Sequence, residues 1–180
     1  YWKGRSNRDR IMDLMAPEWH KAYNAGIFTE FQEQRAPGHT VAGYKIFTKG
    51  FLDLKDEISK SIAHIDYLND PLAYNKYEEL KAMNIAADAI IMYAERYAVE
   101  LDNLALKEDD PVRKNELTRM AEICRKVPAH APGTVHEMLQ HYWFIHVGVI
   151  SELNPWDSFN PGRLDQHLYP LFKKERETGS

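Results

Sequence analysis

The sequence predicts a mostly α-helical fold with few or short strands, and three observations support this prediction. First, apolar residues recur at the 3.6-residue period of a helix, most clearly over residues 78–106. Second, several segments begin or end at Pro, Asn or Asp residues that are typical of helix termini. Third, Pro and Gly gather in two loops, 35–43 and 154–162, which both carry unusual polar residues.

The first 43 residues predict short helices followed by a loop. An apolar stripe over residues 11–15 follows a charged start, and Pro17 interrupts it. Residues 19–34 mix aromatic and polar side chains, with Gly26 as the expected break. Residues 35–43 contain one Pro and two Gly, so we expect a loop or tight turn there rather than the interior of a helix.

The middle of the chain carries the strongest helical signals. Apolar residues recur at roughly helical spacing over 52–65, and Asn-Asp-Pro at 69–71 ends that segment. Residues 78–106 predict an uninterrupted helix of about 43 Å, at ~1.5 Å per residue. Two Asp residues before Pro111 favour the start of a further helix over 111–126. Nine residues make up the apolar stripe of the long helix: Met83, Ala87, Ile90, Ile91, Ala94, Tyr97, Ala98, Leu101 and Leu104.

The last third of the chain changes in character. Residues 142–150 form a nearly continuous apolar run, which predicts a fully buried helix that passes into a buried strand. A loop rich in Pro and Gly follows at 154–162, and residues 163–174 predict a final helix. A buried run needs partners, so the pattern alone predicts the helical portion of a larger protein. We expect an apolar face without a partner in this chain, with three candidates: Val147, Val149 and Ile150.

Composition excludes several classes of protein. The net charge of −4 gives no basic excess for nucleic acid, and no apolar run approaches the ~18 residues of a membrane span. A single cysteine excludes an internal disulfide framework and a zinc site built from cysteines. The first ten residues hold four Arg or Lys and no apolar stretch, so they do not resemble a signal peptide. We therefore expect a soluble, cytoplasmic protein.

Neither the histidines nor the cysteine form a recognisable catalytic or metal motif. His136, His141 and His146 are five residues apart, so successive members rotate by roughly 140° around a helix and do not share a face. We interpret them as hydrogen-bonded core or interface histidines and expect no metal. Cys124 lies in a predicted helix, where its basic neighbours in sequence point elsewhere, so we expect a structural cysteine.

The two loops offer the residues best suited to chemistry. Phe31, Arg35 and His39 occur at four-residue intervals, and Arg35 could bind a carboxylate while His39 could exchange a proton. In the second loop, Asp157 lies near Phe159, and an acid among aromatic rings can have a raised pKa that suits proton transfer. The residues alone leave a structural alternative open, in which the charged groups form ion pairs or caps and the histidine is a turn residue.

Six stretches carry a resemblance to a known family, in order along nearly the whole chain. Through these stretches the chain resembles the glycyl radical enzymes, the pyruvate formate-lyase superfamily. They are Met15-Ala-Pro-Glu-Trp19, Gly26-Ile-Phe-Thr-Glu-Phe31, Glu33-Gln-Arg-Ala-Pro-Gly-His-Thr-Val41, Lys49-Gly-Phe-Leu-Asp-Leu54, Val127-Pro-Ala-His130 and Gly162-Arg-Leu-Asp-Gln-His167.

Within the superfamily, the loop residues are most similar to those of dehydratases that act on trans-4-hydroxy-L-proline. The resemblance implies a pocket in which His39 and Asp157 are catalytic, while Phe31, Arg35 and Phe159 bind the substrate. It implies that a partner activase, which uses S-adenosylmethionine and an iron–sulfur cluster, installs a backbone glycyl radical. A cysteine thiyl radical then abstracts hydrogen, hydroxide leaves as water, and the product is 1-pyrroline-5-carboxylate.

Two alternatives remain open at this stage. One is a carbon–sulfur lyase of the same superfamily that acts on a hydroxylated sulfonate, isethionate or dihydroxypropanesulfonate, with Arg35 binding the anion. The other is a helical scaffold or binding module without enzymatic activity.

The family's cysteine loop and glycyl radical loop are both missing from this sequence, and Cys124 lies in neither motif. We therefore expect residues 1–180 to be part of one larger domain, in which they form helical outer portions of a large α/β barrel. On this view the piece alone is inactive and binds no cofactor directly. The full-length protein is expected to be a homodimer that works in anaerobic metabolism.

Overall fold

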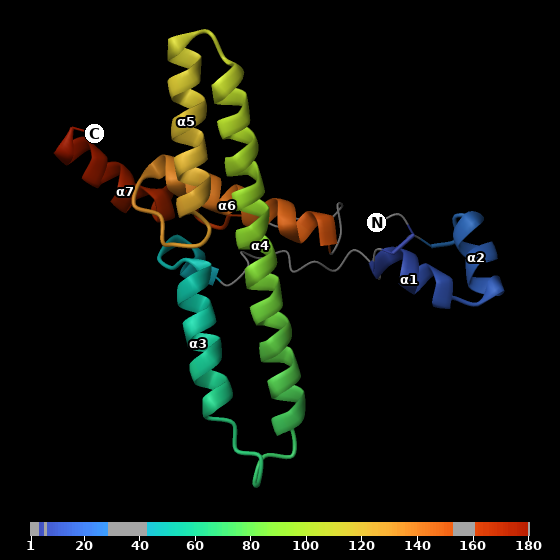
Figure 1. Cartoon of the computed structure of the whole chain (residues 1–180). Coiled ribbons are helices and arrows are strands. Elements are labelled where there is room, and N and C mark those ends of the chain that lie inside the picture. The colour runs from blue at the N-terminus through green and yellow to red at the C-terminus, as the bar shows by residue number, and fades with distance from the viewer. Residues whose placement is uncertain (1–3, 6, 29–42, 153–160, 180) are drawn as a thin grey trace. The chain divides into compact units, whose positions relative to one another are not determined.

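Every element that the computed structural model describes is a helix (Figure 1). No strand occurs among the described residues, which confirms the prediction of a mostly α-helical fold. The described residues are 4–5, 7–28, 43–152 and 161–179. The chain divides into two compact units, of which the first contains Tyr1–Gly43 and Ile145–Gly162 and the second contains Tyr44–Phe144 and Arg163–Ser180.

Two short helices make up the described N-terminal part of the first unit: α1 (Asn7–Leu14) and α2 (Pro17–Asn24). Pro17 occupies the first turn of α2, where its missing N–H costs no hydrogen bond. Gly26 follows the end of α2 with a φ of 71°, a conformation that favours glycine. The predicted interruption at Pro17 and the predicted break at Gly26 are both confirmed.

Aromatic rings stabilise α2. The ring of Trp19 stacks on Tyr23 with centroids 5.2 Å apart and an interplanar angle of 7°. Phe28, beyond the end of the helix, lies 5.2 Å from the same indole ring. A helix of eight residues is marginal by itself, so these contacts contribute to its stability.

The second unit is organised around one long helix, α4 (Ala73–Lys107), which has 35 residues. Helix α3 (Phe51–Ala63) lies beside the first part of α4, and α5 (Pro111–Lys126) runs back along its second part (Figure 1). The predicted helix over 78–106 lies within α4, and the predicted helix over 111–126 has the same bounds as α5. Both predictions are confirmed.

Small side chains allow α4 and α5 to pack closely. Ala98 of α4 and Ala121 of α5 are completely buried, in a cluster that also contains Ala94, Cys124 and Phe144. Because alanine adds only a methyl group, two helices can approach closely and fill the space between them with backbone contacts. The prediction that Cys124 is buried is therefore confirmed.

The apolar run at 142–150 belongs to a single helix, α6 (Val135–Glu152). The predicted buried strand is wrong, and so is the prediction that the run is fully buried. Phe144 and Ile145 are buried, but Trp143 is 55% exposed. Successive helical residues are about 100° apart, so a continuous apolar run cannot face the same core all along its length.

The candidate uncovered face, Val147, Val149 and Ile150, is half-buried rather than exposed. More exposed apolar side chains lie on α4, where Ile85 and Met92 are more than half exposed. The final helix, α7 (Leu164–Thr178), confirms the helix predicted over 163–174 and continues four residues further.

Candidate functional site

The five residues predicted to form the pocket lie outside the described residues. They are Phe31, Arg35, His39, Asp157 and Phe159. The structure therefore neither brings them together nor separates them, and their roles stay predictions. It does describe the two elements that follow these loops in the sequence, a short 3₁₀ helix and the final helix α7.

The first loop leads into η1 (Gly43–Phe47), a short 3₁₀ helix that is firmly anchored. Its residues Ile46 and Phe47 are 1% and 9% exposed, so they pack as core residues. Lys45 and Lys49 both form ion pairs with Glu57 of α3. The hydrogen bond from Lys49 lowers the pKa of the Glu57 carboxyl, which keeps this carboxylate charged at neutral pH. The chain leaving the first loop is thus fixed to α3.

The second loop leads into α7, whose first turns contact η1 directly. His167 of α7 stacks on Phe47 with ring centroids 4.0 Å apart and an interplanar angle of 13°. Phe47 follows His39 by eight residues, and His167 follows Asp157 by ten. The structure therefore joins the two chain segments that leave the two candidate loops.

The start of α3 packs against the backbone of residues 127–130. Phe51 and Leu52 donate their N–H groups to the carbonyls of Pro128 and Ala129, at 2.8 and 3.0 Å. These are donors that a helix start leaves without partners in its own helix, so the contact satisfies both. Gly50 permits the close approach, because a Cβ atom there would lie 2.2 Å from the carbonyl oxygen of Ala129.

The start of α6 is held by three carboxylate and hydroxyl contacts. Glu175 of α7 accepts a hydrogen bond from the N–H of Val135 at 2.8 Å. The Thr134 hydroxyl accepts from the N–H of Glu137 at 3.1 Å, and the Glu137 carboxylate accepts from the N–H of Gly133 at 2.6 Å, so two more backbone N–H groups at this helix start have partners. Burial disfavours the Glu137 carboxylate, yet hydrogen bonds from Lys126 and Gly133 hold its pKa below the usual value. These contacts tie α6 to α7.

His141 of α6 is the most unusual polar residue of this region. It is 1% exposed, and both ring nitrogens lack a hydrogen-bond partner in the described part of the chain. Desolvation lowers the pKa of His141 to about 4, so the ring is neutral at physiological pH. Its centroid lies 6.2 Å from that of Phe51. The prediction that His141 is buried is confirmed, but the prediction that it is hydrogen-bonded is wrong.

Cys124 behaves as a structural residue. Desolvation raises the pKa of its thiol to about 11, so the reactive thiolate is absent at neutral pH. Within the described ranges, no group of three His, Cys, Asp or Glu side chains could hold a metal ion.

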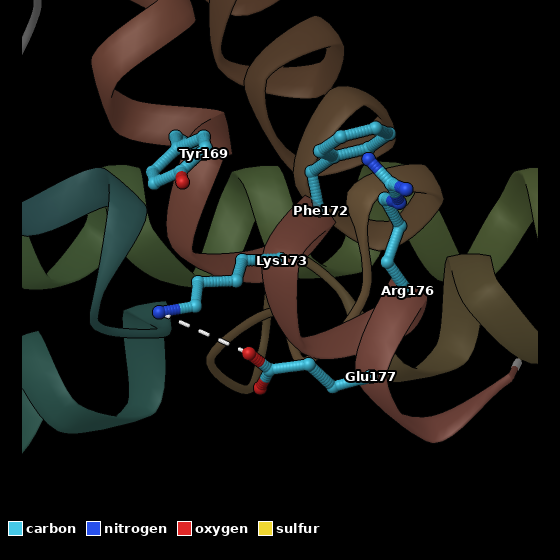
Figure 2. A pocket seen from close by; sticks show the side chains of 5 residues that line it. All are labelled: Tyr169, Phe172, Lys173, Arg176 and Glu177. Carbon is cyan, nitrogen blue, oxygen red and sulfur yellow. Dashed lines mark ion pairs between the residues drawn. The ribbon is translucent and has the colours of Figure 1, made fainter.

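A shallow hollow on α7 is formed by five side chains of that helix (Figure 2). Its volume is about 270 Å³, and its residues are Tyr169, Phe172, Lys173, Arg176 and Glu177. Lys173 pairs with Glu177 at 3.8 Å, while the Arg176 guanidinium lies 6.0 Å from the centroid of Phe172. One helix lines only one side of a cavity, so this hollow does not enclose a substrate.

Sequence reasoning missed the Phe47–His167 stack and the close approach of Gly50 to the backbone of residues 129–130. The available signal was the family resemblance itself, which includes Gly50 and His167 in two of its six stretches. No helical periodicity marks either residue, because their partners are distant in sequence.

Comparison with known proteins identifies the family. The model of the family described as "Pyruvate formate lyase-like" matches residues 1–180. The chain belongs to this family. It is 52% identical to trans-4-hydroxy-L-proline dehydratase of Clostridioides difficile over 179 residues, which are 99% of this chain and 23% of that protein. It is 32% identical to isethionate sulfite-lyase of Nitratidesulfovibrio vulgaris over 188 residues, again 99% of this chain and 23% of the relative.

A solved structure extends the likeness to the fold. The crystal structure of hydroxyproline dehydratase from Clostridioides difficile, with its substrate trans-4-hydroxy-L-proline bound, matches with a TM-score of 0.82 and 53% identity. The match covers 99% of this chain and 23% of that chain. This pyruvate formate lyase-like chain thus spans about a quarter of the length of the relatives it matches. Relatives of this type fold as a large barrel, which agrees with the predicted fold class.

None of the helices in the described residues has an apolar stretch long enough to cross a membrane.

Proposed function

We propose that the protein containing this chain is a glycyl radical lyase that dehydrates trans-4-hydroxy-L-proline to 1-pyrroline-5-carboxylate. One observation carries the proposal: 52% identity to trans-4-hydroxy-L-proline dehydratase along 99% of this chain. The likeness to a substrate-bound crystal structure of that enzyme, at a TM-score of 0.82, supports it. Residues 1–180 are then one part of a single larger catalytic domain.

In this proposal the two loops supply acid chemistry and substrate binding. A hydroxyl is a poor leaving group, so a positioned acid at His39 or Asp157 accelerates its departure, by a factor on the order of 10²–10⁴ for a typical general acid. Arg35 pairs with the substrate carboxylate through its guanidinium. Phe31 and Phe159 exclude water from the radical chemistry. The reaction balances, because the substrate loses one water and forms one ring C=N bond.

Hydrogen abstraction requires groups outside this chain. A backbone glycyl radical, installed by a partner activase that uses S-adenosylmethionine and an iron–sulfur cluster, would supply it. Organic radicals react with oxygen, so the proposed enzyme works under anaerobic conditions. Its proposed location is the cytoplasm. A homodimer is the proposed assembly of the full-length protein.

The second candidate function is carbon–sulfur cleavage of a hydroxylated sulfonate such as isethionate. The 32% identity to an isethionate sulfite-lyase favours it, although this identity is well below the 52% to the dehydratase. Arg35 would then bind the sulfonate in place of a carboxylate.

The test uses the full-length protein, activated anaerobically by its activase. His39→Ala and Asp157→Ala are each expected to lower the rate of 1-pyrroline-5-carboxylate formation by a factor on the order of 10² or more. The glycyl radical signal in electron paramagnetic resonance should persist, because neither residue belongs to the radical loop. His64→Ala and Asp109→Ala replace exposed residues of the same types and serve as matched controls.

Wild-type turnover in both pocket variants would contradict the assigned roles. Release of sulfite from isethionate, without turnover of hydroxyproline, would favour the second candidate. The absence of both reactions in the radical-loaded protein would favour the alternative of a helical scaffold or binding module without enzymatic activity.

A further inference from the structure

Helix α4 carries a regular row of large apolar side chains that lie largely exposed. Each of them is at least half exposed, from 50% for Val99 to 78% for Leu106. Single exposed apolar side chains are common on protein surfaces, but a continuous row of them marks an interaction surface. The four members, which form the outer seam of α4, are seven residues apart: Ile85, Met92, Val99 and Leu106.

The outer seam lies opposite the face of α4 that packs within the second unit. Ala94 and Ala98, which are buried beside α5, follow Met92 by two and six residues, or about 200° and 240° around the helix. Helices α3 and α5 both lie along one side of α4 (Figure 1). Seven residues turn a helix to within about 20° of two full turns, so the four seam residues stay on one side. A further element can therefore reach the seam without displacing α3 or α5.

The seven-residue spacing indicates that the element which fits the seam is a helix. Two helices that wind around each other bring every seventh residue back to their contact. A hollow of about 510 Å³ lies along the middle of the seam and is formed by side chains of α4 alone. A second helix laid along α4 would close this hollow from its open side. The lining residues are Asp88, Ile91, Met92, Glu95, Arg96 and Val99.

The charges around the hollow indicate the chemistry of that second helix. On one edge the carboxylates already have basic partners, since Asp88 pairs with Lys55. Glu95, on the same edge, lies 3.7 Å from Arg125. On the other edge Arg96 is exposed, and the described part of the chain provides no ion pair for its guanidinium. An Asp or Glu on the docking helix would pair with this guanidinium.

The length of the relatives favours the same polypeptide as the source of this helix. The chain covers 23% of the dehydratase from Clostridioides difficile, so about three quarters of such a protein lie outside residues 1–180. A tethered segment reaches a surface at an effective concentration on the order of millimolar, which few separate molecules match.

We propose that the outer seam is the docking site of an amphipathic helix from the part of the same polypeptide outside residues 1–180. The docking helix presents apolar residues at seven-residue spacing to the seam and an acidic residue to Arg96. The proposal rests on the proposed function only in placing this chain within one larger domain.

Methionine oxidation in the full-length wild-type protein tests the seam without a mutation or an activity assay. Met92 of the seam and Met83 of the same helix are 59% and 55% exposed within residues 1–180. With hydrogen peroxide, Met92 is expected to oxidise on the order of tenfold more slowly in the folded protein than in urea, because the docked helix covers it. Met83 lies off the seam and should be protected less than about threefold. Little protection of Met92, or equal protection of both methionines, would overturn the proposal.

A photo-cross-linker identifies the occupant of the seam. Val99 is replaced by p-benzoylphenylalanine in the full-length protein, which is irradiated and separated on a denaturing gel. The expected product is a single chain whose cross-linked peptide lies outside residues 1–180. The same replacement at Val112, an exposed valine of α5, is the matched control and should not label that peptide.

Three results of the cross-linking would overturn the proposal. A covalent dimer would identify a second copy of the chain as the occupant. A cross-link within residues 1–180 would identify a contact inside this part of the protein. The absence of any cross-link would show that the seam faces solvent.

Substitution of Arg96 tests the chemistry of the docking helix. Arg96→Glu should raise the oxidation rate of Met92 by a factor on the order of threefold or more, because it places a like charge against the acidic partner. Arg96→Lys keeps the positive charge and should stay within about twofold of the wild type. Arg119→Glu makes the same change at an exposed arginine of α5 and should leave Met92 unaffected. A wild-type rate in Arg96→Glu would contradict the acidic partner and overturn the proposal.

The proposed function and the docking site fail in different experiments. If the wild-type protein does not dehydrate hydroxyproline, the proposed function fails, while the oxidation and cross-linking results still decide what covers the outer seam.

Discussion

Gly50 lies where two backbone segments of the second unit approach each other closely. A Cβ atom at this position would lie 2.2 Å from the Ala129 oxygen and 2.4 Å from two backbone atoms of His130. Backbone atoms cannot swing aside as the end of a side chain can, so the crossing must separate to admit a methyl group. Separation would also break the hydrogen bonds from Phe51 and Leu52.

We predict that Gly50→Ala lowers the free energy of unfolding by about 3 kcal/mol, as expected for severe overpacking with the loss of hydrogen bonds. Urea unfolding measures the change. Gly133→Ala is the control, because its Cβ would meet only the ends of the Lys126 and Glu137 side chains, at 3.3 and 3.4 Å. Equal stability of the two variants would contradict the claim that the backbone of residues 129–130 leaves no space for a Cβ atom at Gly50.

His141 gives a prediction about pH. Burial lowers its folded-state pKa to about 4, below the value of about 6.5 in an unfolded chain. Between these values the unfolded chain binds the proton more readily, so stability is complete above pH 6.5 and decreases as the pH falls toward 4. The full loss amounts to about 3 kcal/mol.

The measurement is urea unfolding at a series of pH values from 7 to 4. His141→Leu should abolish this part of the decrease, because it removes the buried titrating group. His136→Leu, which replaces an exposed histidine of the same helix, should retain it. An unchanged pH dependence in His141→Leu would show that other groups cause the decrease.

At the scale of elements, the pairing of α4 and α5 depends on alanine. Ala98 and Ala121 are fully buried where the two helices pack. We predict that Ala98→Leu destabilises the protein by about 1–3 kcal/mol, because three added carbon atoms have no space between the helices. Val99→Leu adds one carbon to the adjacent, half-exposed position and should change stability by less than about 0.5 kcal/mol. Thermal unfolding of both variants compares them.

The elements could be predicted where local signals are strong. Asp110 caps α5 by accepting the N–H of Val112, and Pro111 begins the helix, as the sequence indicates. The run at 142–150 shows why the rest could not be predicted. Hydrophobicity indicates that a residue prefers burial, but the packing of other elements around α6 determines that Phe144 is buried and Trp143 is exposed.

At the scale of the whole molecule, periodicity and composition gave no reason to pair the two loops. Only the family resemblance placed His39 and Asp157 in one pocket, 118 residues apart in sequence. Neither residue is among those described, so their proximity stays a prediction. The stack of Phe47 on His167 joins residues that are 120 apart in sequence, and it depends on tertiary packing that no local pattern encodes.

The last prediction concerns this shared pocket. If His39 and Asp157 act on one leaving hydroxyl, removing either should remove most of the assistance that the pair provides. The double variant His39→Ala/Asp157→Ala should then lose far less activity than the product of the two single losses, because groups that act as a unit are strongly non-additive. The measurement is a double-mutant cycle, which compares single-turnover rates of dehydration among the wild-type protein, the two single variants and the double variant, each full-length and radical-loaded.

Pairing His39→Ala with Asp109→Ala provides the control cycle, since Asp109 is an exposed residue at the start of α5 and outside both loops. Its losses should multiply, as those of distant sites do. Direct contact between His39 and Asp157 is not required, because a substrate or one water can lie between them. Separations above ~15 Å exceed what such a bridge can span. A pocket cycle that multiplies like the control would therefore place the two residues in separate sites and leave only one of them as the general acid.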